Sequence, residues 1–484
     1  MLPAAVAAGH PATTAVGIEV LEAGGTAADA AVAASLASCV AETVMTGLLG
    51  GGHAIYWDAR SGQARNLDCF CAVPRLGAQP AKPAAPGQKT GAHSARLGGT
   101  GGELLELDVR FGEELVHYAV GPASCAVPGL PAGLDALWRE HGRLPWRDLC
   151  SPALRLAQEG VPMPPAHVSC LEMLEPVMTM REGARIYAPG GRLLRPGELL
   201  EQPGLVRALE LLAEEGAASV YRGSIAASLV ELLEERGGLV TRRDLREYEA
   251  TWSEPVQVPY AGTRFLTRSG LAGVALALEC MPVLRGRPEP ERTLVFLDAL
   301  DAAAGAETHT TNLVTVDDEG NACVLTTSLG LGSGDWLPQL DLHLNSMLGE
   351  VDLLVGPLEP GSRMQSMMAP SFAVDDQGPA LAIGSAGGTR LRTALVAVTA
   401  AILDEGLEPQ AAVERPRGHR AGGVVNAEPG GDESALAELE KCGLTVRRWP
   451  GKHHYFGGVS LVSRAGPAAD SRRSGAIGQP RLSG

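Results

Sequence analysis

The sequence has few aromatic residues, a deficit of basic charge and no long apolar segment. Phe, Trp and Tyr make up 4% of its 484 residues, and the formal net charge at pH 7 is −16. Because phosphate backbones are bound by basic faces, this balance argues against nucleic acid as a partner. No window reaches about 18 uninterrupted apolar residues, so we expect no membrane span. Residues 1–20 also lack the basic and apolar regions of a signal peptide, which predicts a cytoplasmic protein.

The nine cysteines are scattered along the chain and include no CxxC pair. Cys69 and Cys71 are too close in sequence to form a disulfide easily, so the pattern indicates reduced thiols rather than a disulfide framework. His343 and the adjacent His453 and His454 have no cysteine or acid at metal-ligand spacing. We therefore expect no metal ion and no cofactor.

Helical periodicity is present in residues 13–23 and again, with proline interruptions, over residues 128–242. The first of these segments stops at a pair of glycines. The stretch Thr26–Val40 is alanine-rich and almost uncharged. Small side chains permit close packing, so this stretch predicts a buried helix whose N-cap lies near Thr26.

Strand patterns separated by turns occupy much of the remaining chain. Strands are expected within residues 54–58, 64–70, 255–270, 312–317, 322–329 and 367–385. Helices first, antiparallel strands later and then more helix predict an α+β layered domain rather than a parallel α/β fold. Residues 75–104 are rich in Pro, Gly and Ala and predict a surface loop. The tail from Ala465 is polar, and on composition alone it predicts disorder.

Six threonines lie within the segment Gly305–Gly330, and three of them, Thr308, Thr310 and Thr311, surround His309 just before a predicted strand. One interpretation is simple β propensity, because threonine favours strands. The other is that one of these threonines is a nucleophile that becomes exposed when the chain is cut.

Several segments, in the expected order, resemble the γ-glutamyltranspeptidase family. They are residues 22–37 (EAGGTAADAAVAASLA), 47–57 (GLLGGGHAIYW), 127–163, 237–256, 310–329, 384–390 (GSAGGTR) and 468–476 (AADSRRSGA). The resemblance implies the four-layer αββα sandwich of N-terminal-nucleophile hydrolases. It also implies a precursor that cuts itself before a threonine, giving a large fragment, residues 1–309, and a small fragment, residues 310–484. The two fragments would stay associated as one intertwined domain.

In the family the nucleophile stands seven residues ahead of a strand aspartate, which here is Asp317. Thr310 has this spacing, and the cut would then fall between His309 and Thr310. Thr308 is the rival, because the family's usual Thr-Thr-His becomes Thr-Thr-Asn here and the only Thr-His pair is Thr308 with His309.

The chemistry explains why a threonine would have to be freed. A hydroxyl in mid-chain is a weak nucleophile and needs an adjacent base. After scission, the new α-amino group of Thr310 lies beside its own Oγ, and its reference pKa of about 7.7–8.0 leaves a fair fraction neutral at physiological pH. One residue then supplies both the nucleophile and the base.

Acyl transfer also requires donors for the developing oxyanion, and Gly387 and Gly388 stand directly before a predicted helix. Backbone N–H groups at a helix N-terminus suit a negative charge, and the missing Cβ lets a substrate approach. The alternative is that the two glycines form a tight strand-to-helix turn, and the same pair can serve both purposes. The resemblance assigns the oxyanion hole to this glycine pair and implies that Ser328 orients the amine of the nucleophile.

The resemblance also implies residues that bind the substrate. Glu350 matches the acid that binds the substrate's α-ammonium group, with Asp352 as the second choice. Ser366 matches the first of two serines that hold the α-carboxylate.

Three positions depart from the family pattern. Phe70 stands where an arginine normally pairs with the α-carboxylate, Met367 replaces the second serine, and Gly330 replaces an asparagine. A bidentate guanidinium is hard to replace in carboxylate recognition.

The sequence therefore predicts an autoprocessed γ-glutamyltransferase-like amidohydrolase. It would cleave a γ-glutamyl or related small amide through an acyl-threonine intermediate, with transfer to water or an amine. Two alternatives remain open: an amidohydrolase for a non-glutamyl small amide, and a non-catalytic paralogue that acts as a scaffold or binding protein.

Overall fold

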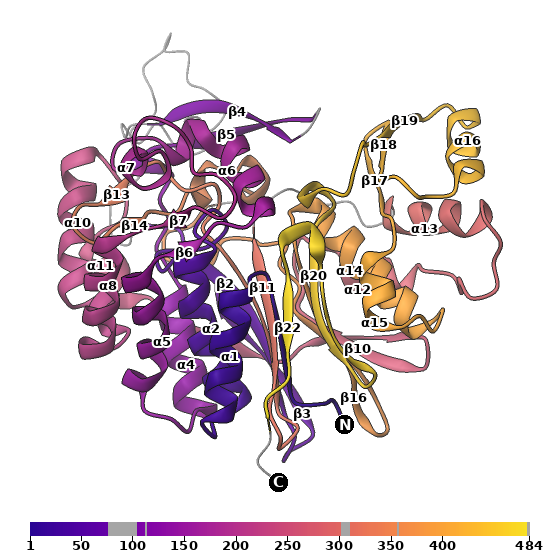
Figure 1. The fold of residues 1–484 in the computed structure, drawn as a ribbon, viewed down its shortest axis with the longest axis horizontal. Coiled ribbons are helices and arrows are strands. Elements are labelled where there is room, and N and C mark those ends of the chain that lie inside the picture. The colour runs from indigo at the N-terminus through magenta and orange to yellow at the C-terminus, as the bar shows by residue number, and fades with distance from the viewer. Residues whose placement is uncertain (76–103, 112–113, 302–309, 356–357, 482–484) are drawn as a thin grey trace.

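Two β-sheets stack face to face in the centre of the protein, and helices cover the outer face of each sheet (Figure 1). The computed structural model describes residues 1–75, 104–111, 114–301, 310–355 and 358–481. The predicted loop at 75–104 lies outside the described residues except for its first and last residue. Thr308 and His309 also lie outside them. The four-layer αββα sandwich that the sequence predicts is confirmed.

The first sheet has seven strands, and every neighbouring pair in it is antiparallel. In spatial order the strands are β22 (Ala476–Gly478), β1 (Ala5–Ala8), β11 (Thr311–Val316), β12 (Ala322–Ser328), β2 (Gly51–Asp58), β3 (Gln63–Cys69) and β8 (Thr251–Ser253). Strands from residues 1–309 and from residues 310–484 therefore alternate within one sheet. β11 and β12 lie between β1 and β2, so a chain cut before β11 would leave both parts hydrogen-bonded to each other.

The second sheet has six antiparallel strands and packs on the first through β16 and β20. In spatial order they are β21 (Gly466–Ala469), β20 (Gly458–Ser463), β16 (Gly378–Ala386), β15 (Ser371–Asp375), β10 (Thr263–Thr267) and β9 (Val256–Tyr260). The interior between the sheets is filled by apolar side chains from both inner faces.

The helices form the two outer layers. On the side of the first sheet are α1 (Pro11–Glu22), α2 (Ala27–Ala41), α4 (Leu130–His141), α5 (Trp146–Glu159), α6 (Pro165–Met178), α7 (Gly183–Tyr187), α8 (Pro203–Glu215), α9 (Ala218–Tyr221), α10 (Ser224–Arg236) and α11 (Arg242–Glu247). On the side of the second sheet are α12 (Val274–Glu279), α13 (Glu291–Asp301), α14 (Thr389–Leu403), α15 (Pro409–Glu414) and α16 (Glu433–Lys441). A small sheet of β17 (Gly418–Ala421), β18 (Val424–Ala427) and β19 (Thr445–Arg448) lies beside α13 and α16.

Helix α2 lies directly against β11 and β12, and all of its residues are buried. Thr26 is its N-cap, as the sequence predicts, and the structure adds a capping box with Asp29. The Thr315 hydroxyl donates to the Ala27 carbonyl at 2.7 Å, and a carboxylate oxygen of Asp317 accepts from the Ala27 N–H at 2.9 Å. These two bonds fix the start of α2 to β11, so the alanine-rich helix serves as the platform under the strand that follows Thr310.

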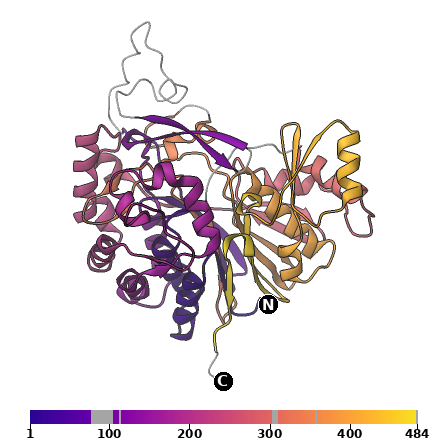
Figure 2. The same ribbon diagram turned by 45° about the horizontal axis from the view of Figure 1, so that its top comes forward.

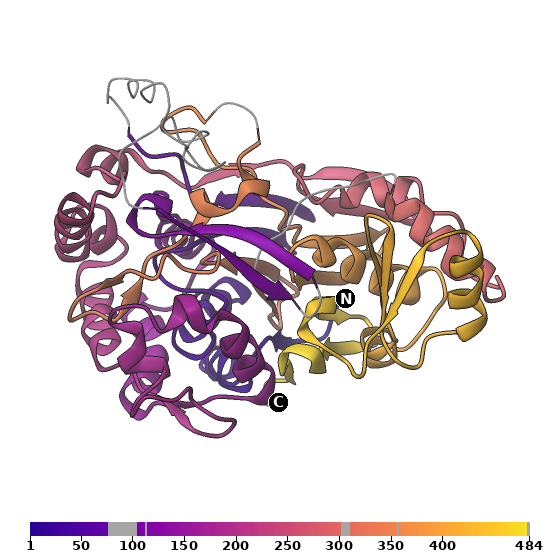
Figure 3. The same ribbon diagram turned by 90° about the horizontal axis from the view of Figure 1, so that it is seen from above.

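A long hairpin, β4 (Leu105–Phe111) with β5 (Glu114–Val120), crosses the end of the sandwich (Figures 2 and 3). Tyr118 of this hairpin forms a β-bridge with Glu350. Two short strand pairs complete the fold, β6 (Val161–Pro162) with β7 (Leu199–Leu200) and β13 (Trp336–Leu337) with β14 (Leu342–His343). Within the described residues, no helix is both long and apolar enough to cross a membrane.

The C-terminal tail is ordered, and the expectation of disorder was wrong. The composition after Ala465 predicts disorder, but this segment forms β21, a 3-10 turn at Ser471–Arg473 and β22. The reason is strand pairing together with burial: β21 pairs with β20, β22 pairs with β1, and Ala468 belongs to an apolar cluster. Strand β2 also begins at Gly51, earlier than the expected residue 54, because its glycines pair with β12 and β3.

Candidate active site

Thr310 is buried immediately before β11, at the end where the two sheets meet helix α14. Its Oγ1 accepts a hydrogen bond of 2.8 Å from the backbone N–H of Gly387. Its carbonyl oxygen accepts a bond of 3.2 Å from Nη1 of Arg473. Two residues far apart in the sequence therefore hold the hydroxyl and the backbone of the residue that the sequence predicts as the nucleophile.

Gly387 connects β16 to α14, and Gly388 is the N-cap of that helix. The φ of Gly387 is 120°, a conformation that other residues rarely adopt. A Cβ at this position would also lie 2.7 Å from Cα of Gly457, so a side chain has no room. The N-terminal, partly positive end of a 15-residue helix is thereby placed beside the Thr310 hydroxyl. This arrangement suits the stabilisation of negative charge on an oxygen.

The side chains of β11 alternate between the two faces of the first sheet, and this alternation orients Thr310. Thr311 and Thr315 point to the helix layer, where their hydroxyls donate to Glu42 and to the Ala27 carbonyl. Asn312 points to the second sheet, where its amide donates to the Ser460 carbonyl at 3.5 Å. Since successive side chains in an extended chain point to opposite faces, Thr310 shares the face of Asn312 and turns toward Gly387.

Ser328 ends β12 and is buried. Thr311 pairs with Thr327 in the antiparallel ladder, so one further step in the register places Ser328 opposite Thr310. Directly opposed residues have Cβ atoms about 4.5–5.5 Å apart. The Ser328 hydroxyl accepts the N–H of Gly330 at 2.9 Å. This position suits a group that contacts the backbone nitrogen of Thr310.

Glu350 is buried and lies next to Gly330. The φ of Gly330 is 70°, and a Cβ there would lie 2.6 Å from Oε1 of Glu350. A side chain at this position would therefore require the side chains of Glu350 and Ser346 to move. Through Ser328 and Gly330, the Glu350 carboxylate is connected to the surroundings of Thr310. Asp352 is half-buried on the following 3-10 turn.

Ser366 is buried, and its hydroxyl accepts the N–H of Met368 at 3.2 Å. Its carbonyl accepts Nη1 of Arg268 at 3.0 Å. Met367 and Phe70 belong to one apolar cluster. The Phe70 ring is fully buried and stacks on the ring of His53, with ring centres 5.5 Å apart. The two positions where the family has an arginine and a second serine are thus part of a hydrophobic core.

Burial keeps His53 neutral, and its pKa lies well below the usual value because of desolvation and the nearby charges of Arg268 and Arg363. Arg363 is bound by its surroundings: it pairs with Asp68 at 3.2 Å and donates to the Phe70 carbonyl at 3.2 Å. The guanidinium of Arg363 therefore supports the backbone of this region.

Two residues near Thr310 were not identified from the sequence. Arg473 is almost completely buried, its pKa is lowered by burial, and it binds the Thr310 carbonyl. Glu42 is completely buried, burial raises its pKa, and it accepts the hydroxyl of Thr311. The segment AADSRRSGA was already part of the resemblance and could have indicated Arg473. No pattern in the sequence indicates Glu42.

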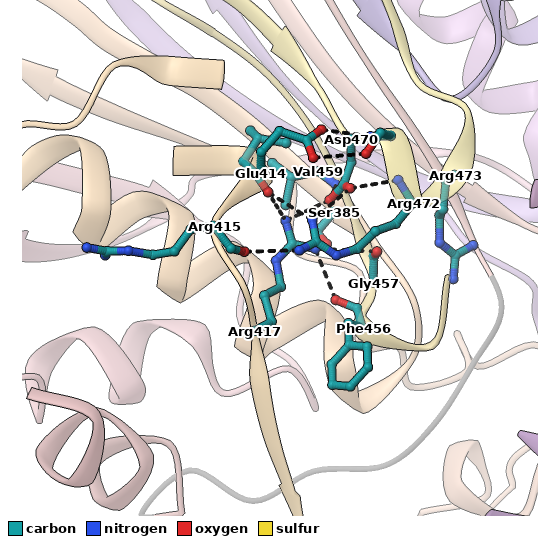
Figure 4. A network of polar contacts seen from close by, with 12 residues as sticks. Ser385, Glu414, Arg415, Arg417, Phe456, Gly457, Val459, Asp470, Arg472 and Arg473 are labelled. Carbon is teal, nitrogen blue, oxygen red and sulfur yellow. Dashed lines mark hydrogen bonds and ion pairs between the residues drawn. The ribbon is translucent and has the colours of Figure 1, made fainter. Parts of the chain in front are cut away.

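A buried network of charges holds the segment that carries Arg473. Figure 4 shows Arg417 and Arg472 reaching toward Asp470, at 2.6 Å and 3.1 Å respectively. Arg472 also donates to Glu428 through Nε at 2.7 Å, and both of these side chains are completely buried. Because buried charges require matched partners, this network fixes the turn after β21 and therefore the position of Arg473.

Similarity to known proteins identifies the family of this chain. The family model described as gamma-glutamyltranspeptidase matches residues 13–113, 102–293 and 297–479. The chain is 27% identical over 529 residues to the acylase ACY 1 proenzyme of Pseudomonas sp. (strain V22), covering 95% of this chain and 89% of the relative. It is 24% identical over 557 residues to the glutathione hydrolase proenzyme of Bacillus subtilis (strain 168), covering 97% and 90%.

Among solved structures, the cephalosporin acylase from Bacillus halodurans superposes with a TM-score of 0.80 at 23% identity, covering 100% of this chain and 96% of that one. At this identity the superposition establishes the fold. Together, the matched family model and the relatives named as hydrolase and acylase support an amidohydrolase or acyltransferase of the N-terminal-nucleophile type. The resemblance inferred from the sequence is confirmed, and the chain belongs to the gamma-glutamyltranspeptidase family.

Proposed function

We propose that this protein is a self-processing amidohydrolase in which Thr310 is the nucleophile. The observation that carries the proposal is the 2.8 Å hydrogen bond between the Gly387 N–H and Oγ1 of Thr310. It joins a hydroxyl at the start of β11 to a backbone donor at the N-terminus of α14. Acyl transfer needs this combination of a nucleophilic oxygen and a preorganised donor beside it.

In self-processing, Oγ1 of Thr310 attacks the carbonyl carbon of His309. The C–N bond between these residues breaks, the nitrogen takes up the hydroxyl proton, and an ester joins His309 to Thr310. Water then hydrolyses the ester and leaves a carboxylate on His309 and a free amine on Thr310. The fragments 1–309 and 310–484 remain together because their strands alternate in the first sheet.

In catalysis, the freed amine of Thr310 accepts the proton of its own hydroxyl while Oγ1 attacks the amide of a small substrate. The N–H groups of Gly387 and Gly388 stabilise the oxyanion, and Ser328 orients the amine from the opposite strand. The proton passes to the leaving amine, and an acyl-threonine ester remains. Water or a second amine then releases the acyl group and restores the free Thr310.

For the acyl donor, we favour a small amide whose acyl group carries no α-carboxylate. Phe70 and Met367 are buried in one apolar cluster, so the arginine and the second serine that would bind such a carboxylate are missing. The relative named acylase ACY 1 proenzyme is compatible with a non-glutamyl substrate.

A γ-glutamyl amide is the second candidate substrate. Glu350 is a buried carboxylate near Gly330 and could accept an α-ammonium group, with Asp352 two residues further along the chain. Ser366 would then supply one hydroxyl for the α-carboxylate. The relative named glutathione hydrolase proenzyme is compatible with this substrate.

Mass spectrometry of the purified full chain tests the proposal. We expect two fragments, one ending at His309 and one beginning at Thr310, and an intact chain for the Thr310→Ala variant. A wild-type chain that stays whole would favour the scaffold alternative. A Thr310→Ala chain cut at the same bond would refute the assignment of the nucleophile and return attention to Thr308.

A further inference from the structure

We propose that Glu42 is a positioning residue that turns the Thr310 hydroxyl toward Gly387 by holding the side chain of Thr311. This inference rests on the proposed role of Thr310 as the nucleophile. Glu42 follows the last residue of α2, and its side chain is completely buried. It is therefore a buried carboxyl group within reach of the site that the chemistry described above does not use.

Both oxygens of the Glu42 carboxyl group accept hydroxyl hydrogen bonds. Oε1 accepts from Thr13 of α1 at 2.7 Å, and Oε2 accepts from Thr311, the first residue of β11. Glu42 thus connects the two innermost helices to the strand that follows the nucleophile. Each oxygen of this buried carboxyl group thus has one hydroxyl donor, from Thr13 and from Thr311 respectively.

The contact between Glu42 and Thr311 has no spare room. A Cβ on Gly9 would lie 2.5 Å from Oε2 of Glu42 and 2.8 Å from Oγ1 of Thr311. The backbone of Gly9 therefore closes one side of this hydrogen bond. The rotation of the Thr311 side chain is restricted by packing as well as by the carboxylate.

The segment that connects α2 to β2 contains Thr46 as well as Glu42, and Thr46 contacts β12, the strand that pairs with β11. Oγ1 of Thr46 lies 2.8 Å from Oγ1 of Thr327, and Thr327 is the register partner of Thr311. Glu42 and Thr46 thus hold the last ladder pair before Thr310 and Ser328 from the helix-layer side. Because side chains alternate along a strand, holding Thr311 on this face directs Thr310 to the other face.

Arg473 acts on the same dipeptide through the Thr310 carbonyl. Thr310 and Thr311 are therefore held by a guanidinium at the backbone of one residue and by a carboxyl group at the hydroxyl of the next. Neither Glu42 nor Thr311 needs to touch the substrate for this effect, since both act through the orientation of Thr310.

The test compares the first-order rate of self-processing among variants whose thermal melting is measured in parallel. Thr311→Val removes the hydroxyl, and a small misplacement of reacting atoms costs on the order of 100-fold, so we expect processing to slow by about 10- to 100-fold. Thr311→Ser keeps the hydroxyl and should process within about threefold of the wild-type rate. Glu42→Gln combined with Thr311→Val should be no slower than the slower single variant, because both changes act on the same contact between residues 42 and 311.

Thr315→Val is the matched control, since Thr315 lies on the same strand and face and its hydroxyl also makes a buried bond of 2.7 Å. We expect it to lower the melting temperature and leave the processing rate unchanged. Wild-type processing by Thr311→Val would overturn the role of Glu42 and leave the proposed function standing. A wild-type chain that never processes would overturn both.

Discussion

The two ends of the candidate site differ in how they are built. At the nucleophile end, Thr310, Gly387 and Arg473 are joined by hydrogen bonds that involve the backbone, and Ser328 follows from strand register. At the acyl-recognition end, which we define as Phe70, Ser366 and Met367, apolar packing replaces the expected charge partner. The first end depends on the path of the main chain.

The acyl-recognition end depends on the chemistry of a few side chains, and two of them, Phe70 and Met367, are buried in an apolar cluster. The comparison suggests that the reaction type and the choice of acyl group are separable in this protein. A backbone N–H serves any acyl group, because the oxyanion has the same charge whatever chain is attached to it. Recognition of a carboxylate, in contrast, requires a particular guanidinium or hydroxyl.

The largest effect should come from the nucleophile end. Gly387→Ala introduces a Cβ 2.7 Å from Cα of Gly457 at a φ of 120°, so the N–H is expected to move away from Thr310. Loss of one oxyanion donor lowers kcat by about 100- to 1000-fold. The measurement is kcat on a chromogenic amide, together with the processing rate.

Gly378→Ala is the matched control for that variant. Gly378 also has a positive φ, of 94°, but its Cβ would meet only Trp57, at 4.0 Å. This variant should lose stability and keep its turnover. Equal loss of turnover in both variants would show that backbone strain, and not the donor at Gly387, causes the effect.

A smaller effect is expected at the acyl-recognition end. Wild-type protein should hydrolyse an anilide with an uncharged acyl group in preference to a γ-glutamyl anilide. Phe70→Arg combined with Met367→Ser should shift the ratio of kcat/KM toward the γ-glutamyl anilide by about tenfold, or about 1.4 kcal/mol.

Phe70→Leu preserves an apolar side chain at the same position and should keep the wild-type preference. If the wild-type protein already prefers the γ-glutamyl anilide, the distinction between the two ends fails. Glu350 and Ser366 would then be sufficient for glutamyl recognition.

The smallest effect concerns the pH dependence of stability, with one buried histidine near each end. Burial lowers the pKa of His167 to about 3, and the pKa of His53 lies well below 6.5. Both remain neutral in the folded protein while the unfolded chain binds protons, so their contribution is complete above about pH 6.5 and decreases as the pH falls toward the folded values.

Replacing either histidine with glutamine should reduce the slope of the unfolding free energy between about pH 6 and pH 4 by up to about 1.4 kcal/mol per pH unit. Urea unfolding at several pH values measures this slope. A slope that does not change in the His53→Gln variant would mean that His53 is protonated beside Phe70 in the folded protein.

Much of the fold could be predicted from local patterns. The capping box at Thr26 and the alanine-rich stretch define α2 because propensity, capping and burial agree there. The pairing of Thr310 with the glycine pair could be anticipated as well, because a resemblance to known proteins names both positions. The structure adds the distance and the direction of that contact.

The tail shows where local patterns are insufficient. Its polar composition predicts disorder, but it is ordered by β1, more than 400 residues earlier in the chain, and by the buried Glu428, which lies 44 residues from its partner Arg472. The contact between Glu42 and Thr311 is of the same kind, since 269 residues separate the two side chains. No pattern within a short window reports such pairs.

By itself, the sequence determined which residues can react and which local elements form, because hydroxyls, glycines and side-chain periodicity are properties of neighbours in the chain. Only the tertiary structure decided which side chains meet around Thr310 and that Phe70 is buried in one apolar cluster with Met367. The physical reason is that register, sheet stacking and burial of charge are set by contacts between distant segments, and these arise only when the whole sandwich closes.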